Sequence, residues 1–390
     1  MFKDVFIVSL VGFSYHTAAS AAKVLVPLYC TSLGASVGTI GLVVGAQPLL
    51  PLFLAVPAGA LADRVGFKVM TLAGGVCMCV ASVVYYLSNG IYPLIAGQVL
   101  IGLGELSVWV CAQAAATSIG HTSLRGRNLG YFGFAIALGQ AVAPAMAGRA
   151  ADMFGYHNAF LLSLAFSVLV VLAGFQMPDI RARVHERMGL LGQFARAGEL
   201  SRRPRTRAAL LCTFTMIFTK SVRGSFFPVL LKGYGFSAST IGMLVSLMEG
   251  SSTVVRLFLG SLLRVLREDT LLLSGMVLGI AATAVTPLIM NLPALAVASA
   301  VAGIGLGLNL PLTMSLIASD APDHLRGLAM GVRLTGNRSA QLVSPVIFGV
   351  IGQWLDLGTS FYVVGGLLFL GNLAAGSLLR QARERRMLAT

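Results

Sequence analysis

The stretch Gly59-Ala60-Leu61-Ala62-Asp63-Arg64-Val65-Gly66-Phe67-Lys68 is a short polar break between two long apolar runs, 37–61 and 69–88. Each run is long enough to cross the hydrocarbon core of a bilayer as a helix, which takes about 20 apolar residues. The break between them is charged and contains glycine, as expected of a tight turn at a membrane surface. This pattern recurs along the chain and predicts a protein with several membrane spans.

The composition of the whole chain agrees with this prediction. Of the 390 residues, 56% are hydrophobic and only 11% are charged, and the mean hydropathy is +0.85. A soluble domain has about 45–50% apolar and about 25% charged residues. Too little charge remains to cover a soluble surface. We therefore attribute the net charge of +14 to topology signals in loops, and expect no nucleic-acid partner.

Twelve apolar runs predict an all-α polytopic membrane protein. The expected spans are 5–30, 37–61, 69–88, 92–118, 128–153, 158–177, 208–231, 238–263, 270–290, 293–317, 328–353 and 359–380. An arginine-rich stretch divides the chain into an N-terminal six-helix bundle (1–177), a cytoplasmic linker (178–207) and a C-terminal six-helix bundle (208–390). Within the linker, Leu190, Leu191 and Phe194 could rest at the membrane interface or belong to a plain loop.

The distribution of basic residues predicts the orientation. If both termini lie inside, 20 of the 28 lysines and arginines fall on the cytoplasmic side, and only Arg149 and Lys232 lie near the outer face. An excess of positive charge in cytoplasmic loops is the usual topology signal. We expect a multi-pass protein of a bacterial-type inner membrane with both termini in the cytoplasm.

The two halves of the chain repeat each other with an offset of 201 residues. The matched positions include Pro27 and Pro228, Gly41 and Gly242, Gly102 and Gly303, Pro144 and Pro345, and Gly148 and Gly349. A constant offset over six spans predicts two pseudo-symmetric bundles. It also predicts a substrate site between them, near the midplane of the bilayer.

The quoted loop, 59–68, resembles the signature G-x-L-A-D-R-x-G-R-K of the major facilitator superfamily, with Phe67 in place of an arginine. The repeat is similar to the pseudo-symmetric halves of that family. The resemblance implies the family's twelve-helix fold and a conformational latch made by Gly59, Asp63, Arg64, Gly66, Lys68 and Arg127. A carboxylate at a helix end could also simply cap a tight turn. The copy in the second half has Arg264 where Asp63 stands.

A second resemblance lies in the fifth span. Gly139, Pro144 and Gly148 match three positions of the G-x-x-x-G-P-x-x-G-G motif of the superfamily's antiporters, chiefly the twelve-helix drug:proton exporters. The match implies efflux by antiport, although small residues at these positions could serve helix packing alone. The arginine that such exporters carry in the fourth span is replaced by Gln98.

Ionisable residues inside membrane spans are costly and tend to face cavities or substrate pathways. Eight such residues lie within the expected spans: Lys23, Lys220, Arg223, Arg256, Arg333, Arg338, Glu105 and Glu249. Six cations against two anions predict a positive cavity. Arginine and lysine suit carboxylate or phosphate groups, so we expect an anionic or amphiphilic substrate.

Helical spacing assigns roles to these residues. His16, Ser20, Lys23 and Pro27 share one face of the first span. The expected substrate-binding residues are Lys23, Lys220, Arg223, Arg333, Arg338, Asn337, Gln341 and Trp109. The expected proton-coupling residues are Glu105, Glu249 and His16. Each has a simpler alternative as a packing, topology or snorkelling residue.

These features together predict a secondary active transporter that works by alternating access. The leading hypothesis is proton-coupled export of a small organic anion, such as a carboxylate metabolite or siderophore. The alternatives are a broad drug:proton antiporter and a proton-coupled symporter for uptake. No nucleotide-binding, metal-ligand or enzyme motif is present, so we expect no cofactor and no enzymatic activity. The other expected partners are protons and the lipid bilayer, and we expect a monomer.

Overall fold

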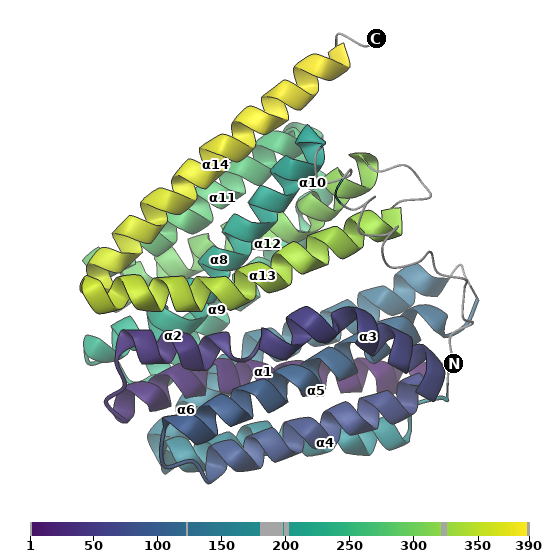
Figure 1. Cartoon of the computed structure of the whole chain (residues 1–390), viewed down its shortest axis with the longest axis vertical. Coiled ribbons are helices and arrows are strands. Elements are labelled where there is room, and N and C mark those ends of the chain that lie inside the picture. The colour runs from purple at the N-terminus through teal and green to yellow at the C-terminus, as the bar shows by residue number, and fades with distance from the viewer. Residues whose placement is uncertain (1, 122–123, 180–197, 199–202, 321–325, 388–390) are drawn as a thin grey trace. The chain divides into compact units, whose positions relative to one another are not determined.

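The computed structural model describes residues 2–121, 124–179, 198, 203–320 and 326–387 (Figure 1). These residues form α-helices joined by short turns, with no β-strand among them. Leu190, Leu191 and Phe194, which were compatible with either an interfacial position or a plain loop, lie outside the described residues.

The helices follow the expected spans closely. They are α1 (Phe2–Ser32), α2 (Val37–Gly45), α3 (Leu49–Val65), α4 (Phe67–Tyr86), α5 (Ile91–Ser118), α6 (Arg125–Phe175), α8 (Pro204–Gly233), α9 (Ala238–Leu257), α10 (Leu259–Val265), α11 (Glu268–Ala284), the short 3₁₀ helix η2 (Thr286–Leu288), α12 (Leu292–Asp320), α13 (Arg326–Trp354) and α14 (Leu357–Met387).

Three of the expected boundaries are corrected by the backbone. The span 37–61 is divided into α2 and α3 just before Pro48, because proline lacks the N–H that a continuous helix needs. The spans 128–153 and 158–177 lie within one long element, α6, which turns sharply at Gly155 with φ 80°. Only glycine adopts that conformation without strain. The span 238–263 is bent by 60° between α9 and α10.

Among the described residues, seven helices are long and apolar enough to cross a membrane, or eight if the bent pair α9 and α10 is one span. This number is lower than twelve for identifiable reasons. The helix α6 is counted once although Gly155 divides it. The helix α11 has only 17 residues, and α8 and α13 carry basic side chains such as Lys220 and Arg338 in their middle parts.

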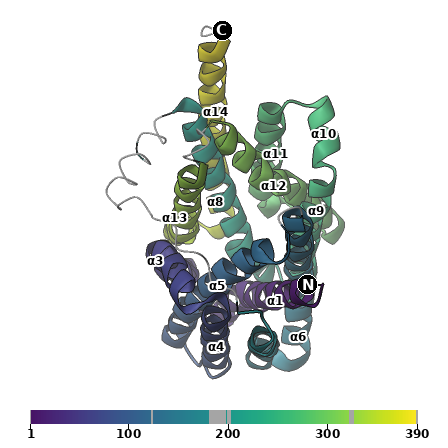
Figure 2. The ribbon, with the colours of Figure 1, turned by 90° about the vertical axis from the view of Figure 1, so that its right-hand side faces the viewer.

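The chain forms two compact units. Unit 1 comprises Met1–Val184, Gly224–Ser246 and Pro345–Val350, and unit 2 comprises the rest. Unit 1 is therefore the first half of the chain with two short segments from the second. Within it, α1 lies beside α5 and α6, and α4 packs on both (Figures 1 and 2). Within unit 2, α11 packs on α12 and α14.

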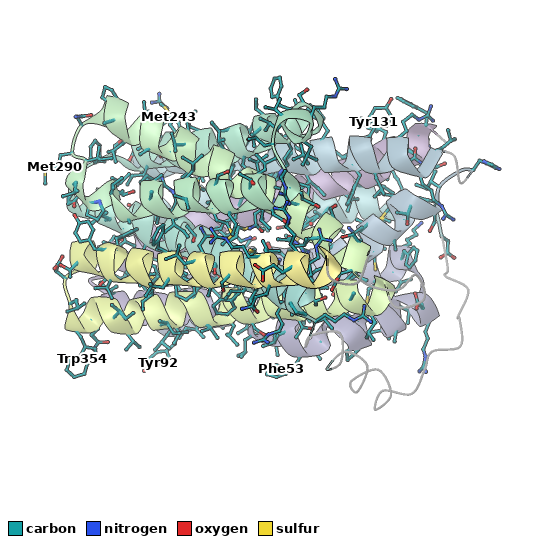
Figure 3. The ribbon with its side chains drawn as sticks, turned by 90° about the horizontal axis from the view of Figure 1, so that it is seen from above. Phe53, Tyr92, Tyr131, Met243, Met290 and Trp354 are labelled. Atoms are coloured by element: carbon teal, nitrogen blue, oxygen red, sulfur yellow. The ribbon has the colours of Figure 1, made fainter. Side chains whose placement is uncertain are left out.

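Large apolar side chains project from the outer faces of the helices. Figure 3 labels six of them, each at least half exposed: Phe53, Tyr92, Tyr131, Met243, Met290 and Trp354. Soluble proteins rarely expose so many large apolar groups, whereas a surface that contacts lipid does.

Candidate functional site

One face of α1 is accessible from its beginning to Lys23. Between residues 5 and 30, the only side chains of α1 that are not buried are Phe6, Ser9, Leu10, Phe13, His16, Ser20 and Lys23. Their spacing of three and four residues defines a single face of a helix, which we call the α1 stripe. The expected polar face was correct at His16, Ser20 and Lys23, but Pro27 is buried.

The α1 stripe ends at an ion pair in unit 1. The Lys23 ammonium lies 3.7 Å from the Glu105 carboxylate on α5, and the Gln47 amide donates a hydrogen bond of 2.8 Å to the same carboxylate. The lysine side chain is 54% exposed and the glutamate 15%. The cation is therefore open to a ligand, while the anion is largely shielded.

Sequence reasoning missed Gln47, which lies in the break between α2 and α3. Gly102 allows this break to approach α5, because a Cβ at Gly102 would lie only 1.9 Å from the Gln47 carbonyl oxygen. The 201-residue repeat could have pointed to Gln47. Gln47 corresponds to Met248, whose carbonyl oxygen lies in the same way against Gly303, next to the ionisable Glu249.

Two other expected site residues, His16 and Trp109, contact each other on the same two helices, α1 and α5. The His16 ring stacks on the Trp109 indole with centroids 5.9 Å apart, and Trp109 stacks in turn on Phe132. The His16 Nε2 atom also lies 3.4 Å from the Tyr15 hydroxyl. Trp109 is one helical turn after Glu105 on α5, so the histidine and the ion pair share one region of unit 1.

Unit 2 holds a second lysine–glutamate pair. The Lys220 ammonium on α8 lies 3.0 Å from the Glu249 carboxylate on α9, and their side chains are 36% and 13% exposed. The pair borders a cavity of about 120 Å³ that Arg256 and Asn337 also line. As in unit 1, the lysine is more accessible than the glutamate.

The expected arginines differ in what they contact. Arg256 donates hydrogen bonds to the Gly307 carbonyl (3.1 Å) and the Ser252 hydroxyl (3.1 Å) at the edge of this cavity. Arg338 donates to Gln341 (3.0 Å). Gln341 in turn donates to Asn337 (2.8 Å), which reaches the cavity. This chain of hydrogen bonds links three expected substrate-binding residues of α13.

Two further arginines are buried inside unit 2. Arg223 is 1% exposed and donates hydrogen bonds to the Ala282 carbonyl and to Ser299 on α11 and α12. Arg333 is 6% exposed and donates to Thr313 on α12. Their guanidinium groups join helices of one bundle, and neither side chain lines the cavity beside Lys220 and Glu249.

Most of the expected latch residues lie at or near the turn between α3 and α4, whereas Arg127 lies on α6. Gly66 has φ 93°, which requires glycine, whereas a side chain at Gly59 would meet nothing within 4 Å. The described latch side chains are placed as follows: Asp63 half-buried near the end of α3, Arg64 exposed at a cavity of about 440 Å³, Lys68 half-buried in the first turn of α4, and Arg127 exposed in the first turn of α6. Phe67 is 3% exposed, which explains why an apolar residue replaces the arginine of the signature.

The motif residues of the fifth expected span, Gly139, Pro144 and Gly148, which we call the helix-five motif, build two close contacts of α6 within unit 1. A Cβ at Gly139 would lie 2.8 Å from the Phe13 carbonyl oxygen of α1. A Cβ at Gly148 would lie 2.1 Å from the Ala238 carbonyl oxygen, and one at Gly242 would lie 2.2 Å from the Pro144 carbonyl oxygen. The motif residues therefore let the backbones of α6 and α9 touch.

A pseudo-symmetric copy of this crossing joins α2 to the Pro345–Val350 segment of α13, also within unit 1. A Cβ at Gly41 would lie 2.3 Å from the Pro345 carbonyl oxygen, and one at Gly349 would lie 3.1 Å from the Gly41 Cα. The crossing of α6 and α9 has one addition that sequence reasoning missed. The Asp152 carboxylate accepts hydrogen bonds from the Ala238 (3.0 Å) and Ser239 (2.7 Å) N–H groups at the start of α9.

Similarity to known proteins agrees with this architecture. The sequence matches the Major Facilitator Superfamily over residues 8–218 and again over 209–388. It is 20% identical over 372 residues to the MFS-type transporter MJ1560 of Methanocaldococcus jannaschii, covering 92% of this chain and 94% of that one. It is 22% identical over 363 residues to the inner membrane transport protein YajR of Escherichia coli (strain K12), covering 89% and 76%.

A solved structure of a variant of the nucleoside transporter NupG superposes with a TM-score of 0.82 at 12% identity, over 96% of this chain and 99% of that one. The family match and the apolar helices together identify a multi-pass membrane transport protein. The chain belongs to the Major Facilitator Superfamily.

Proposed function

We propose that this protein is a secondary active transporter that couples proton movement to the passage of a small organic anion by alternating access. The observation that carries the proposal is the lysine–glutamate pair inside each unit, Lys23 with Glu105 and Lys220 with Glu249. Charged groups within membrane spans are retained where they serve a pathway.

The geometry of the pairs supports an anionic substrate. In both pairs the lysine is the more exposed partner, so a ligand meets positive charge first. A transporter of lipophilic cations would be better served by the reverse arrangement, in which the carboxylate faces the ligand. Asn337, Gln341 and Arg338 add hydrogen-bond donors next to the pair in unit 2.

The contact between lysine and glutamate in each pair also suggests how a proton could control substrate binding. A proton on Glu105 or Glu249 would cancel the charge that holds the neighbouring lysine, because a neutral carboxyl attracts an ammonium far less strongly. The lysine would then be available to the anion. Glu105 and Glu249 are thus proposed as the coupling residues, and Lys23 and Lys220 as substrate-binding residues.

Two directions of coupling are supported by different observations. The helix-five motif, whose residues build the close crossing of α6 and α9, favours export by antiport, as in the exporters that it resembles. The ion pairs favour symport, since protonation of Glu249 would help the anion bind to Lys220. In antiport, proton and substrate must exclude each other, and in symport they must bind together.

The pH dependence of substrate affinity tests the proposal and separates the two directions. Purified protein in lipid nanodiscs is titrated with di- and tricarboxylates, carboxylate siderophores and lipophilic cations between pH 5 and 8. Affinity for an anion that rises as the pH falls indicates symport, and affinity that falls indicates antiport. In either case Glu249→Gln, which mimics the protonated carboxyl, should remove the pH dependence contributed by that site.

The matched control is Asp356→Asn, because Asp356 is an exposed carboxylate that accepts a hydrogen bond from the Thr359 N–H at the start of α14. Proteoliposomes with an imposed pH gradient then show whether the anion moves with or against the proton. Binding of lipophilic cations alone would overturn the anion proposal and support a drug exporter.

We further propose an inner-membrane location with both termini in the cytoplasm, and a monomer as the working unit. The orientation is supported by the excess of basic residues in the loops that it would place inside. Labelling of single cysteines in intact cells tests the orientation. Cysteines placed after Arg380 should react with impermeant reagents only once the cells are opened.

A further inference from the structure

An apolar groove lies between α1 and the first half of α6 in unit 1. It has a volume of about 380 Å³, within the range of small-molecule sites. Its walls include Phe6 and Phe13 of α1 and Phe134 and Leu138 of α6. Phe6 and Phe134 are 60% and 66% exposed, so they present their rings to whatever fills the groove.

The α1 wall of the groove belongs to the same accessible helix face as Lys23. This wall, from Phe6 to Phe13, is the first part of the α1 stripe, and the same stripe continues through His16 and Ser20 to Lys23. With a rise of 1.5 Å per residue, Lys23 lies about 15 Å along the helix from Phe13 and about 25 Å from Phe6. One accessible face thus has an apolar end and a cationic end.

Contact with annular lipid alone does not account for this face. A stripe that simply faced acyl chains would not carry a histidine, a serine and a lysine in its second half, because such groups are costly in hydrocarbon. All other faces of α1 between residues 5 and 30 are buried. The stripe therefore lines a path that is apolar at one end and polar at the other.

We propose that the groove holds the apolar chain of a single-chain anionic amphiphile, whose charged head binds to Lys23. This inference rests on the proposed transport of an organic anion and names its substrate class as a long-chain carboxylate. The occupant is a transported substrate and not a two-chain phospholipid of the bilayer. Charge complementarity at Lys23 and the continuity of the stripe carry the assignment.

The test measures the affinity of the full-length protein in nanodiscs for carboxylates of rising chain length, from butanoate to icosanoate. The groove begins about 15 Å from Lys23, so methylenes beyond about the twelfth carbon reach it, and each of these should raise affinity about fourfold. The alcohol and the trimethylammonium compound of the same chain length should bind at least tenfold more weakly than the carboxylate.

Three variants localise the effect. Phe134→Ser should weaken the binding of octadecanoate at least tenfold and leave that of butanoate unchanged, because only the long chain reaches the groove. Lys23→Gln should weaken carboxylates of every length but not the long-chain alcohol. Phe53→Ser is the matched control, since Phe53 is 68% exposed on α3 and does not line the groove. Leu138→Trp fills the groove without removing apolar surface, so it should also weaken the binding of long-chain carboxylates. It replaces Phe134→Ser if that variant fails to fold.

Other outcomes overturn the inference. They are an affinity independent of chain length, an equal loss in Phe53→Ser and Phe134→Ser, or complete competition by added two-chain anionic phospholipid. If short organic anions still bind at Lys23 and move with protons in these cases, the proposed function stands and only the amphiphile assignment fails. If no anion binds at all, both fail.

Discussion

The glycine crossing of α6 and α9 allows one prediction to be worked out from atomic distances. In Gly148→Ala the new Cβ would lie 2.1 Å from the Ala238 carbonyl oxygen, whereas carbon and oxygen atoms in close contact between backbones lie about 3.3–3.6 Å apart. The helices must separate locally by more than about 1 Å. The atom in the way belongs to the backbone, so no side-chain rotation relieves the clash.

Overpacking of this kind typically costs about 1–3 kcal/mol. We expect Gly148→Ala to destabilise the close contact of α6 and α9 by about 2 kcal/mol. The ratio of molecules with the contact formed to those with it broken should then fall about 30-fold. Gly349→Ala in the pseudo-symmetric crossing should have a smaller effect, because its nearest neighbour is 3.1 Å away. Gly130→Ala, also on α6, meets nothing within 4 Å and should be neutral or stabilising by up to about 1 kcal/mol.

The assay is cross-linking across the crossing, together with thermal unfolding. Ala145→Cys and Ser246→Cys form a suitable pair, because the Ala145 N–H donates a hydrogen bond of 2.9 Å to the Ser246 hydroxyl. The five native cysteines are first replaced. Cross-linking should be slowed strongly by Gly148→Ala and not by Gly130→Ala. Equal rates and equal melting temperatures in these two variants would refute the packing argument.

Three further predictions concern polar contacts. Asp152→Ala removes the side chain that caps α9 and should cost about 1 kcal/mol of stability. It should also slow the cross-link between positions 145 and 246. A normal cross-linking rate would show that the cap does not hold the crossing. Because the Thr359 hydroxyl and N–H bond to its carboxylate, the pKa of Asp356 lies below its usual value. Its stabilisation of α14 should therefore be present at neutral pH and lost below about pH 4 in thermal melts, and Asp356→Asn should abolish this pH-dependent part. Lys220→Met leaves the Glu249 carboxylate without its ammonium partner. It should lower the melting temperature more than the double variant Lys220→Met/Glu249→Gln, which leaves no carboxylate unpaired. If the double variant instead shows the sum of the two single losses, the two side chains do not form a direct pair.

Periodicity in the sequence was sufficient to predict one face of α1. His16, Ser20 and Lys23 recur at intervals of three and four, and the structure leaves all three accessible. Pro27 continues the same spacing but is buried, because its neighbours in space close over that end of the helix. Spacing gives the face of a helix, but only packing decides how far along it remains open.

The partners of the ionisable residues were not readable from the sequence. Counting charges predicted an excess of positive charge but not which residues pair, whereas the structure pairs Lys23 with Glu105 and Lys220 with Glu249. It also encloses Arg223 within unit 2. Each of these contacts joins different helices, and its existence depends on the rotation of each helix about its own axis, which sequence periodicity does not specify.

The sequence by itself determined that this is an all-helical membrane protein with two repeated halves, because span length, charge depletion and the 201-residue offset are properties of the chain. It also placed glycines at both crossings. Only the tertiary structure decided that Gln47 reaches Glu105 and that Asp152 caps α9. The physical reason is that hydrogen bonds act over about 3 Å, and residues far apart in the chain come that close only when packed helices bring them together.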